Sequence, residues 1–253
     1  MSTLLKNASI FTKQGFRKQD VLISDHRVLF TDSIDNLTSE TIDTVYDLNG
    51  LFMIPGFVDV HVHLREPGFS YKETIRTGTD AAAHGGYTAV CAMPNLKPAP
   101  SNLANLQPEL DAIRKDALVH VYPYGTITEQ QTGRGALGKM EEIAPYVIAY
   151  SDDGKGMQDE ASMREAMQRA KCLDRMIVAH CEDERELVPG GCIHDGEYAR
   201  LHHHIGINSA SEWKQVERDV RLAAETGVRY HVCHVSTKES VEIIRAAKKA
   251  GTH

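Results

Sequence analysis

From Pro55 onward the sequence alternates between short apolar runs, rich in β-branched residues, and longer segments with helical spacing. The apolar runs cover residues 57–64, 87–95, 118–127, 147–154, 176–183 and 228–237. Segments with apolar residues at i, i+3 and i+4, several of which end in glycine, cover residues 72–86, 103–116, 159–172, 211–227 and 236–251. Strands that alternate with helices at this spacing form a parallel sheet, so the sequence predicts an α/β fold.

Polar side chains gather where the apolar runs end. Five of the six runs finish in such residues, namely His61, His63, Asn95, Asp152, Asp153, His180 and His234. In a closed βα barrel the active site lies at the carboxyl ends of the strands. An open, doubly wound sheet binds its ligands near one switch point only. Polar ends on five strands therefore favour a (β/α)8 barrel of the TIM type.

The number of strands sets a limit on this interpretation. A TIM-type barrel has eight strands, and the sequence offers six candidates before it stops at residues 250–253. We therefore expect a barrel domain, residues 55–253, that is truncated at its C-terminus. The preceding residues, 1–54, show short strand-like runs with turn residues such as Asn36 between them and no helical period. We expect a small β-rich domain there.

Composition excludes several classes of protein. The chain has 28 basic and 35 acidic residues, a formal charge of −7, and no basic run, which disfavours nucleic acid and anionic membranes as partners. It has neither a transmembrane-length apolar stretch nor a secretory signal. Its five cysteines are widely spaced, and we interpret them as buried thiols of a cytoplasmic protein.

His61 and His63 are the first sign of a metal site. Alternate residues of a strand point to the same face, so the two imidazoles lie together while Val62 faces the other way. A His-x-His pair alone is weak, but His180 and His234 end two other strands and Asp153 ends a third. Taken singly, Asp153 could cap a helix and His180 could be a packed ring. Taken together, these residues predict a site for zinc or a similar divalent ion.

The residues around these positions resemble a known family. PGFVDVHVHLREPG is similar to the first-strand signature of the amidohydrolase superfamily, in the form typical of dihydroorotases. The resemblance continues through GTDAAAHGGYTAVCAMPN, SDDG, AHCED and CHVST, in the order and spacing of the family, and covers essentially the whole chain. It implies that the N-terminal strands belong to a small β-sandwich.

The resemblance also implies metal ligands and roles for them. His61 and His63 would hold a first metal, and His180 and His234 a second. Many relatives bridge the two metals with a carbamylated lysine from the fourth strand, but here that strand contains no lysine before its turn. The chain resembles the subgroup in which an aspartate takes this position.

Residues 151–154 offer two candidates for the bridging aspartate. We choose Asp153 over Asp152 because relatives with an SDDG-like end use the residue just before the glycine. Strand alternation allows only one of the two side chains to point inward. Lys155 lies past the turn and is the weaker candidate for a ligand.

The implied reaction is the reversible hydrolysis of dihydroorotate to N-carbamoyl-aspartate in pyrimidine biosynthesis. Opening the cyclic amide requires a hydroxide near neutral pH and an electrophile at the carbonyl, and one or two zinc ions supply both. Dihydroorotate also carries a carboxylate, with which Arg65 could make a planar bidentate pair. The resemblance assigns Asn95 to the same group, and we place His63 in the substrate site as well.

The aspartate that serves relatives as general acid and base comes from the eighth strand, beyond His253. We therefore expect no catalytic residue within this chain and little or no activity from these 253 residues alone. Two alternatives remain open. One is a related hydantoinase, dihydropyrimidinase or allantoinase, whose substrates lack the ring carboxylate. The other is a non-catalytic scaffold for aspartate transcarbamoylase. We expect a homodimer, with aspartate transcarbamoylase as a further candidate partner.

The remaining histidines and glycines have simpler interpretations. We expect His202, His203 and His204 to face solvent, and His194 has no partner at ligand spacing. Residues 133–135 do not join a strand to a helix in the way a phosphate-binding loop does, so nucleotide binding is not supported.

Overall fold

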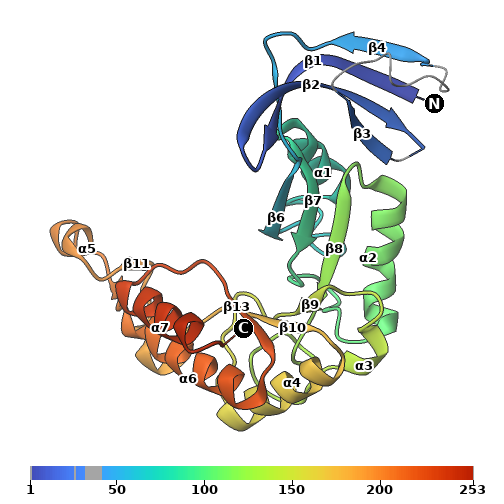
Figure 1. Ribbon diagram of the computed structural model, residues 1–253. Coiled ribbons are helices and arrows are strands. Elements are labelled where there is room, and N and C mark those ends of the chain that lie inside the picture. The colour runs from blue at the N-terminus through green and yellow to red at the C-terminus, as the bar shows by residue number, and fades with distance from the viewer. Residues whose placement is uncertain (1, 26, 32–41, 253) are drawn as a thin grey trace. The chain divides into compact units, whose positions relative to one another are not determined.

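The computed structural model describes residues 2–25, 27–31 and 42–252 (Figure 1). The turn expected at Asn36 lies outside these ranges. The chain divides into two compact units, residues 1–56 and 57–253, and each is described by itself. Among the described residues no helix is long and apolar enough to cross a membrane.

The first unit is a five-stranded sheet. Its strands are β1 (Ser2–Thr12), β2 (Gly15–Ser24), β3 (Arg27–Thr31), β4 (Thr44–Asp47) and β5 (Phe52–Met53). Strand β2 pairs antiparallel with both β1 and β3, whereas β4 and β5 run parallel to β1. Ala8, Ile10 and Val21 form a small buried core on this sheet. The expected short strands are present, and membership of a β-sandwich stays a prediction.

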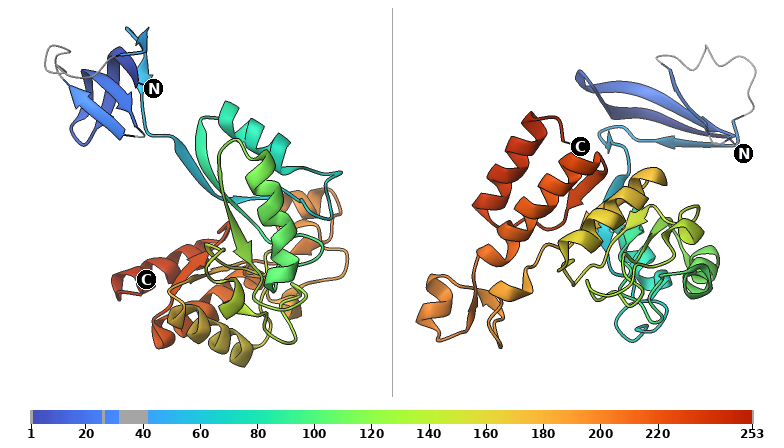
Figure 2. Two further views of the ribbon diagram at one scale, coloured as in Figure 1. Left: turned by 90° about the vertical axis from the view of Figure 1, so that its right-hand side faces the viewer. Right: turned by 90° about the horizontal axis from the view of Figure 1, so that it is seen from below.

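The second unit contains the six-stranded parallel sheet expected from the apolar runs. Its strands, in spatial order, are β6 (Phe57–Val62), β7 (Tyr87–Ala92), β8 (His120–Gly125), β9 (Ala149–Tyr150), β10 (Met176–Ala179) and β13 (Arg229–Val232). Every neighbouring pair is parallel, and the sheet curls as a barrel wall does (Figures 1 and 2). The predicted α/β barrel-type fold is confirmed, with six strands.

Helices cover one side of this sheet (Figure 2). The helices of the second unit are α1 (Ile75–His84), α2 (Leu103–Asp116), α3 (Met140–Ile143), α4 (Glu160–Cys172), η2 (Glu184–Glu186), α5 (Glu197–Leu201), α6 (Ala210–Thr226) and α7 (Lys238–Lys249). The side chains of Thr74, Asn102, Asp159 and Thr237 cap α1, α2, α4 and α7, each by accepting a backbone N–H bond in the first turn. Gly227 ends α6 in the left-handed conformation, with φ of 69°.

The sequence did not reveal the short elements between η2 and α6. Two-residue strands β11 (Ile193–His194) and β12 (Gly206–Ile207) form a separate parallel pair, with α5 between them. Elements of two to five residues contain too little of a repeat to give a periodic signal.

Alternating residues of the sheet pack into two separate cores. On the side of the helices, Ile177 and Tyr150 belong to the largest buried cluster. On the opposite side lies a second cluster, formed by Cys91, Met93, Tyr124, Ala149, Val178 and Cys233. Both faces of the strands are therefore apolar, and the polar residues are left to the strand ends and loops.

All five cysteines are free. Cys91, Cys181 and Cys233 lie in strands or just after them and are buried, as expected. The same interpretation is wrong for Cys172 and Cys192, which are exposed because they lie at the end of α4 and in the loop before β11.

Candidate metal centre

Strand β6 and the residue that follows it place two imidazoles at the carboxyl end of the sheet. The ring centroids of His61 and His63 lie 5.2 Å apart. Val62 and Leu64, the residues that alternate with them, pack into the apolar core beside α1. Strand alternation thus directs the histidines to the face opposite the helices.

Asp153, in the loop after β9, lies at the centre of four histidines. Its Oδ1 is 3.4 Å from His61 Nε2, 3.6 Å from His234 Nε2 and 3.8 Å from His180 Nδ1. Its Oδ2 is 3.8 Å from His63 Nε2. These atoms form two groups of ligand type, each with all members within 4.8 Å of one another. We name them the first triad (His61, His63, Asp153) and the second triad (Asp153, His180, His234).

The donor set fits a divalent cation. Asp153 Oδ1 and His63 Nδ1 are buried and have no hydrogen-bond partner among the described residues. An orphaned buried carboxylate oxygen is costly unless a cation satisfies it. Four imidazoles and one carboxylate are the ligand types that zinc and similar ions prefer. The two triads could therefore each hold a metal ion.

The protonation of the histidines differs within the centre. Burial lowers the pKa of His61, His63 and His180, which favours the neutral rings that a metal requires. The contact with Asp153 instead raises the pKa of His234, whose side chain is 48% exposed. Burial by itself would raise the pKa of Asp153. The contacts with His234 and the other histidines lower this pKa by more than burial raises it, so the net shift is downward.

Asp152 has a different position from its neighbour. It is buried, and its carboxylate accepts hydrogen bonds from the backbone N–H groups of Ile127 (2.8 Å), Thr128 (3.0 Å) and Gly133 (3.0 Å) and from the Thr128 hydroxyl. Burial raises the pKa of Asp152 despite these bonds. Asp152 thus holds the loop of residues 127–133 together and points away from the histidines. Lys155 is directed elsewhere too, with Nζ 3.8 Å from Glu184 Oε1.

Arg65 and Asn95 flank the first triad. Arg65 adopts a φ of 62° and places its positive charge near His63. Burial is the main cause of the lowered pKa of His63, and the charge of Arg65 lowers this pKa further. Asn95 donates a hydrogen bond from Nδ2 to the backbone oxygen of Asp153 at 2.7 Å. Its Oδ1 is buried without a partner among the described residues. Asn95 therefore already supports the centre, and its role in substrate binding, like those of His63 and Arg65, stays a prediction.

A polar hollow of about 280 Å³ adjoins the second triad. Besides His180 and His234 it is lined by residues that the sequence did not single out for the site, including Glu182, His194, Glu212 and Ser236. Glu182 Oε2 lies 3.7 Å from His180 Nε2. Glu182 could have been found from its place in the AHCED motif, whereas Glu212 lies within a helix and has no sequence signal.

Glu212 anchors the loop that follows His234. Its carboxylate accepts hydrogen bonds from the backbone N–H groups of Ser236 and Thr237, each at 3.1 Å, and from both hydroxyls. His202, His203 and His204 are exposed, as expected, and Tyr198 packs against the His202 ring at 4.2 Å between centroids.

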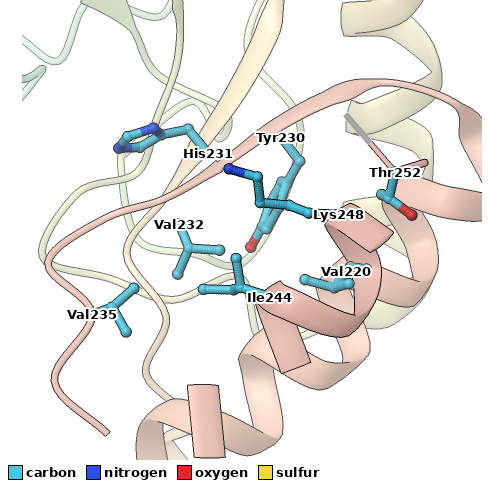
Figure 3. A pocket seen from close by; sticks show the side chains of 9 residues that line it. Val220, Tyr230, His231, Val232, Val235, Ile244, Lys248 and Thr252 are labelled. Atoms are coloured by element: carbon cyan, nitrogen blue, oxygen red, sulfur yellow. The ribbon is translucent and has the colours of Figure 1, made fainter. Parts of the chain in front are cut away.

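An apolar hollow lies apart from the candidate metal centre. It measures about 490 Å³ and is lined by residues of α6, β13 and α7, including Val220, Val232 and Ile244, which face one another (Figure 3). None of the predicted ligands lines this hollow. The lining also includes Tyr230, His231 and Lys248 but no carboxylate, so it is mainly a packing surface.

Solved structures share this fold. The L-hydantoinase (dihydropyrimidinase) from Arthrobacter aurescens superposes with a TM-score of 0.81 at 21% identity, covering 99% of this chain and 56% of that one. The D-hydantoinase (dihydropyrimidinase) from Thermus sp. gives a TM-score of 0.76 at 22% identity, covering 99% and 56%. At such identity the similarity establishes a hydantoinase-type fold.

The sequence relatives define the family more narrowly than the solved structures do. A family profile described as "Dihydro-orotase-like" matches residues 50–240, and the chain belongs to this family. The dihydroorotase of Anoxybacillus flavithermus is 46% identical over 252 residues, and that of Fusobacterium nucleatum 44% identical over 248 residues. These alignments cover 99% and 98% of this chain but only 58% and 57% of the relatives. The chain thus spans a little over half the length of the curated relatives it matches.

Proposed function

We propose that the protein is a dihydroorotase, which interconverts dihydroorotate and N-carbamoyl-aspartate in pyrimidine biosynthesis. The observation that carries this proposal is the convergence of four histidines and Asp153 at the strand ends of a chain from the dihydro-orotase-like family. In the hydrolytic direction, water adds to the carbonyl of the cyclic amide, the C–N bond breaks and the leaving nitrogen takes up a proton.

The proposed metal ligands are the members of the two triads. His61 and His63 would hold one zinc ion, His180 and His234 another, and the Asp153 carboxylate would contact both. A bound divalent ion lowers the pKa of water and polarises a carbonyl oxygen. The lowered pKa of His61, His63 and His180 keeps these rings neutral and able to bind near pH 7.

The proposed substrate contacts come from Arg65, Asn95 and His63. Arg65 would pair its planar guanidinium with the ring carboxylate, because Arg forms two parallel hydrogen bonds with such groups. Asn95 still has one N–H bond and a buried Oδ1 to offer beside His63. In keeping with the family resemblance, we place the general acid and base outside residues 1–253.

The presence of Arg65 favours dihydroorotate over other cyclic amides. Hydantoin and allantoin lack the ring carboxylate, so an arginine two residues beyond His63 would have no anion to bind. A non-catalytic scaffold for aspartate transcarbamoylase remains the alternative of another class, and the complete set of triad ligands speaks against it. We further propose a homodimer, association with aspartate transcarbamoylase and, from five free cysteines, a cytoplasmic location.

The test uses the protein expressed from its complete natural reading frame. We expect zinc in the purified protein, conversion of dihydroorotate and N-carbamoyl-aspartate that a chelator abolishes, and little turnover of hydantoin or allantoin. The Arg65→Lys variant should retain metal and raise KM for dihydroorotate about tenfold or more, since a point charge replaces a planar fork. Absence of bound metal, or preference for hydantoin, would overturn the proposal.

A further inference from the structure

The backbone of Asp153 is held by two side-chain amides from two different loops. Asn95 Nδ2, after β7, and Gln131 Nε2, after β8, each donate a hydrogen bond of 2.7 Å to the carbonyl oxygen of Asp153. A carbonyl oxygen has two lone pairs, so both bonds can be made at once. Two side chains thus fix the peptide plane of a residue whose own side chain stands among four histidines.

An aspartate needs such a backbone contact more than a longer side chain would. Only one methylene group separates its Cα from its carboxylate, and its χ1 angle occupies one of three staggered wells. The position of the carboxylate is therefore set almost entirely by the position of the backbone. A small movement of the Asp153 peptide would carry Oδ1 away from His61, His180 and His234 together.

Gln131 is itself placed by the neighbouring aspartate. Asp152 binds the backbone N–H groups on either side of it, at residues 127, 128 and 133. The Gln131 N–H group bonds to the Thr128 carbonyl at 3.2 Å, which closes a turn. Gln131 has a φ of 55°, a conformation that is uncommon for residues other than glycine and that surrounding contacts must maintain.

We propose that Gln131 is a positioning residue that, together with Asn95, clamps the Asp153 carbonyl and so sets where the bridging carboxylate stands. The proposal rests on the proposed metal binding of the two triads. The two adjacent aspartates then have linked tasks. Asp152 shapes the loop of residues 127–133, and Gln131 returns from that loop to hold Asp153.

The experiment measures cobalt(II) affinity of the metal-free full chain by visible absorption, with competition by a chelator. Gln131→Met keeps the length of the side chain and removes the donor, so affinity should fall about tenfold, the low end for groups that orient metal ligands. Gln131→Asn suits a positive φ better but is one methylene too short to reach the carbonyl. It should lose affinity as Gln131→Met does, while thermal unfolding of the metal-free chain changes little.

The matched control is Asn105→Leu. The side chain of Asn105 also donates from its amide to a backbone oxygen, that of Ala99 at 3.0 Å, but does not contact Asp153. We expect its cobalt affinity to stay within about twofold of the unmodified chain. Equal cobalt affinity of Gln131→Asn and the unmodified chain would refute the clamp, and so would an equal loss in Asn105→Leu. If the unmodified chain binds no cobalt, the proposed function fails instead.

Discussion

The two triads share Asp153 but are held in different ways. The first triad takes His61 from β6 and His63 from directly after it, and the alternating residues Val62 and Leu64 pack in the apolar core beside α1. The second triad takes its histidines from the ends of two strands, β10 and β13, and His234 is about half exposed with a φ of 31°. Its loop is fixed by one carboxylate, that of Glu212 on α6.

This difference shows two routes to a preorganised site. A pair of ligands on one strand inherits its geometry from the sheet, so packing alone determines it. Ligands on separate strands require hydrogen bonds that reach across elements, and a single residue can then decide whether they meet. We therefore expect the second triad to be the easier one to disturb.

Replacing Asp153 should have the largest effect, because it removes the one residue that both triads contain. We expect Asp153→Asn to weaken cobalt binding at both triads by more than about 100-fold, beyond the range of changes to groups behind the ligands. Isothermal titration of the metal-free protein measures the affinity of each triad. Glu184→Gln is the control, because the Glu184 carboxylate pairs with Arg134 and Lys155 and not with the histidines; this variant should bind metal as the unmodified protein does. If either triad of Asp153→Asn kept its metal affinity, that triad would not depend on Asp153, and the prediction would be wrong.

Replacing Glu212 should affect one triad only. Glu212→Ala removes the acceptor for two backbone N–H groups and two hydroxyls in the loop after His234. We expect metal affinity at the second triad to fall about 10- to 30-fold while the first triad is unchanged. Loss of these bonds should also lower the free energy of unfolding by about 1–3 kcal/mol. Glu217→Ala, an exposed position of the same helix, provides the control; equal losses at both triads would contradict the comparison.

Lowering the pH should weaken metal binding at the second triad before the first, with a smaller effect than either substitution. The pKa of His234 is raised, so His234 keeps its proton to higher pH than His61, His63 and His180, whose pKa values are lowered. As the pH falls, metal affinity at the second triad should therefore begin to drop at a higher pH than at the first triad, approaching tenfold per pH unit for each proton displaced. Metal titrations over a series of pH values measure this, and a parallel decline of the two triads would contradict it.

The same shifts predict opposite effects on the stability of the metal-free protein. The raised pKa of His234 contributes stability that is fully present below about pH 6.5 and is lost as the pH rises through the folded-state pKa. The lowered pKa of the other three histidines reduces stability as the pH falls below about 6.5. Urea unfolding of His234→Gln at pH 6 and pH 8 isolates the first contribution: the variant should lose more stability at pH 6.

Much of the fold and of the centre follows from local sequence patterns. The period of two separates His61 and His63 from Val62 and Leu64. Asp153 and Asp152 do point in different directions, but they lie in the loop after β9 and not in a strand. Glycine stops and capping side chains bound the longer helices within a few residues of their expected ends. These features depend on neighbours in sequence, so one chain suffices to detect them.

The residues that hold the centre in place were not predictable in this way. Glu212 acts on the backbone of residues 236–237, and Gln131 acts on the backbone of Asp153. Backbone groups are nearly the same at every residue, so the residue type at a position does not show whether its backbone bonds to a distant side chain. The run at residues 147–154 also shortens to the two residues of β9, and Asp152, in the loop that follows, bonds to the backbone of residues 127, 128 and 133.

The order of strands in the six-stranded sheet has a consequence for biosynthesis. Each of the strands β7, β8, β9, β10 and β13 pairs with the sheet strand that precedes it in the chain. No pairing has to wait for a distant segment, so the sheet can grow unit by unit while the ribosome is still adding residues. Every stage leaves a newly made strand open at the growing edge, and chaperone protection is most valuable there until the next strand arrives.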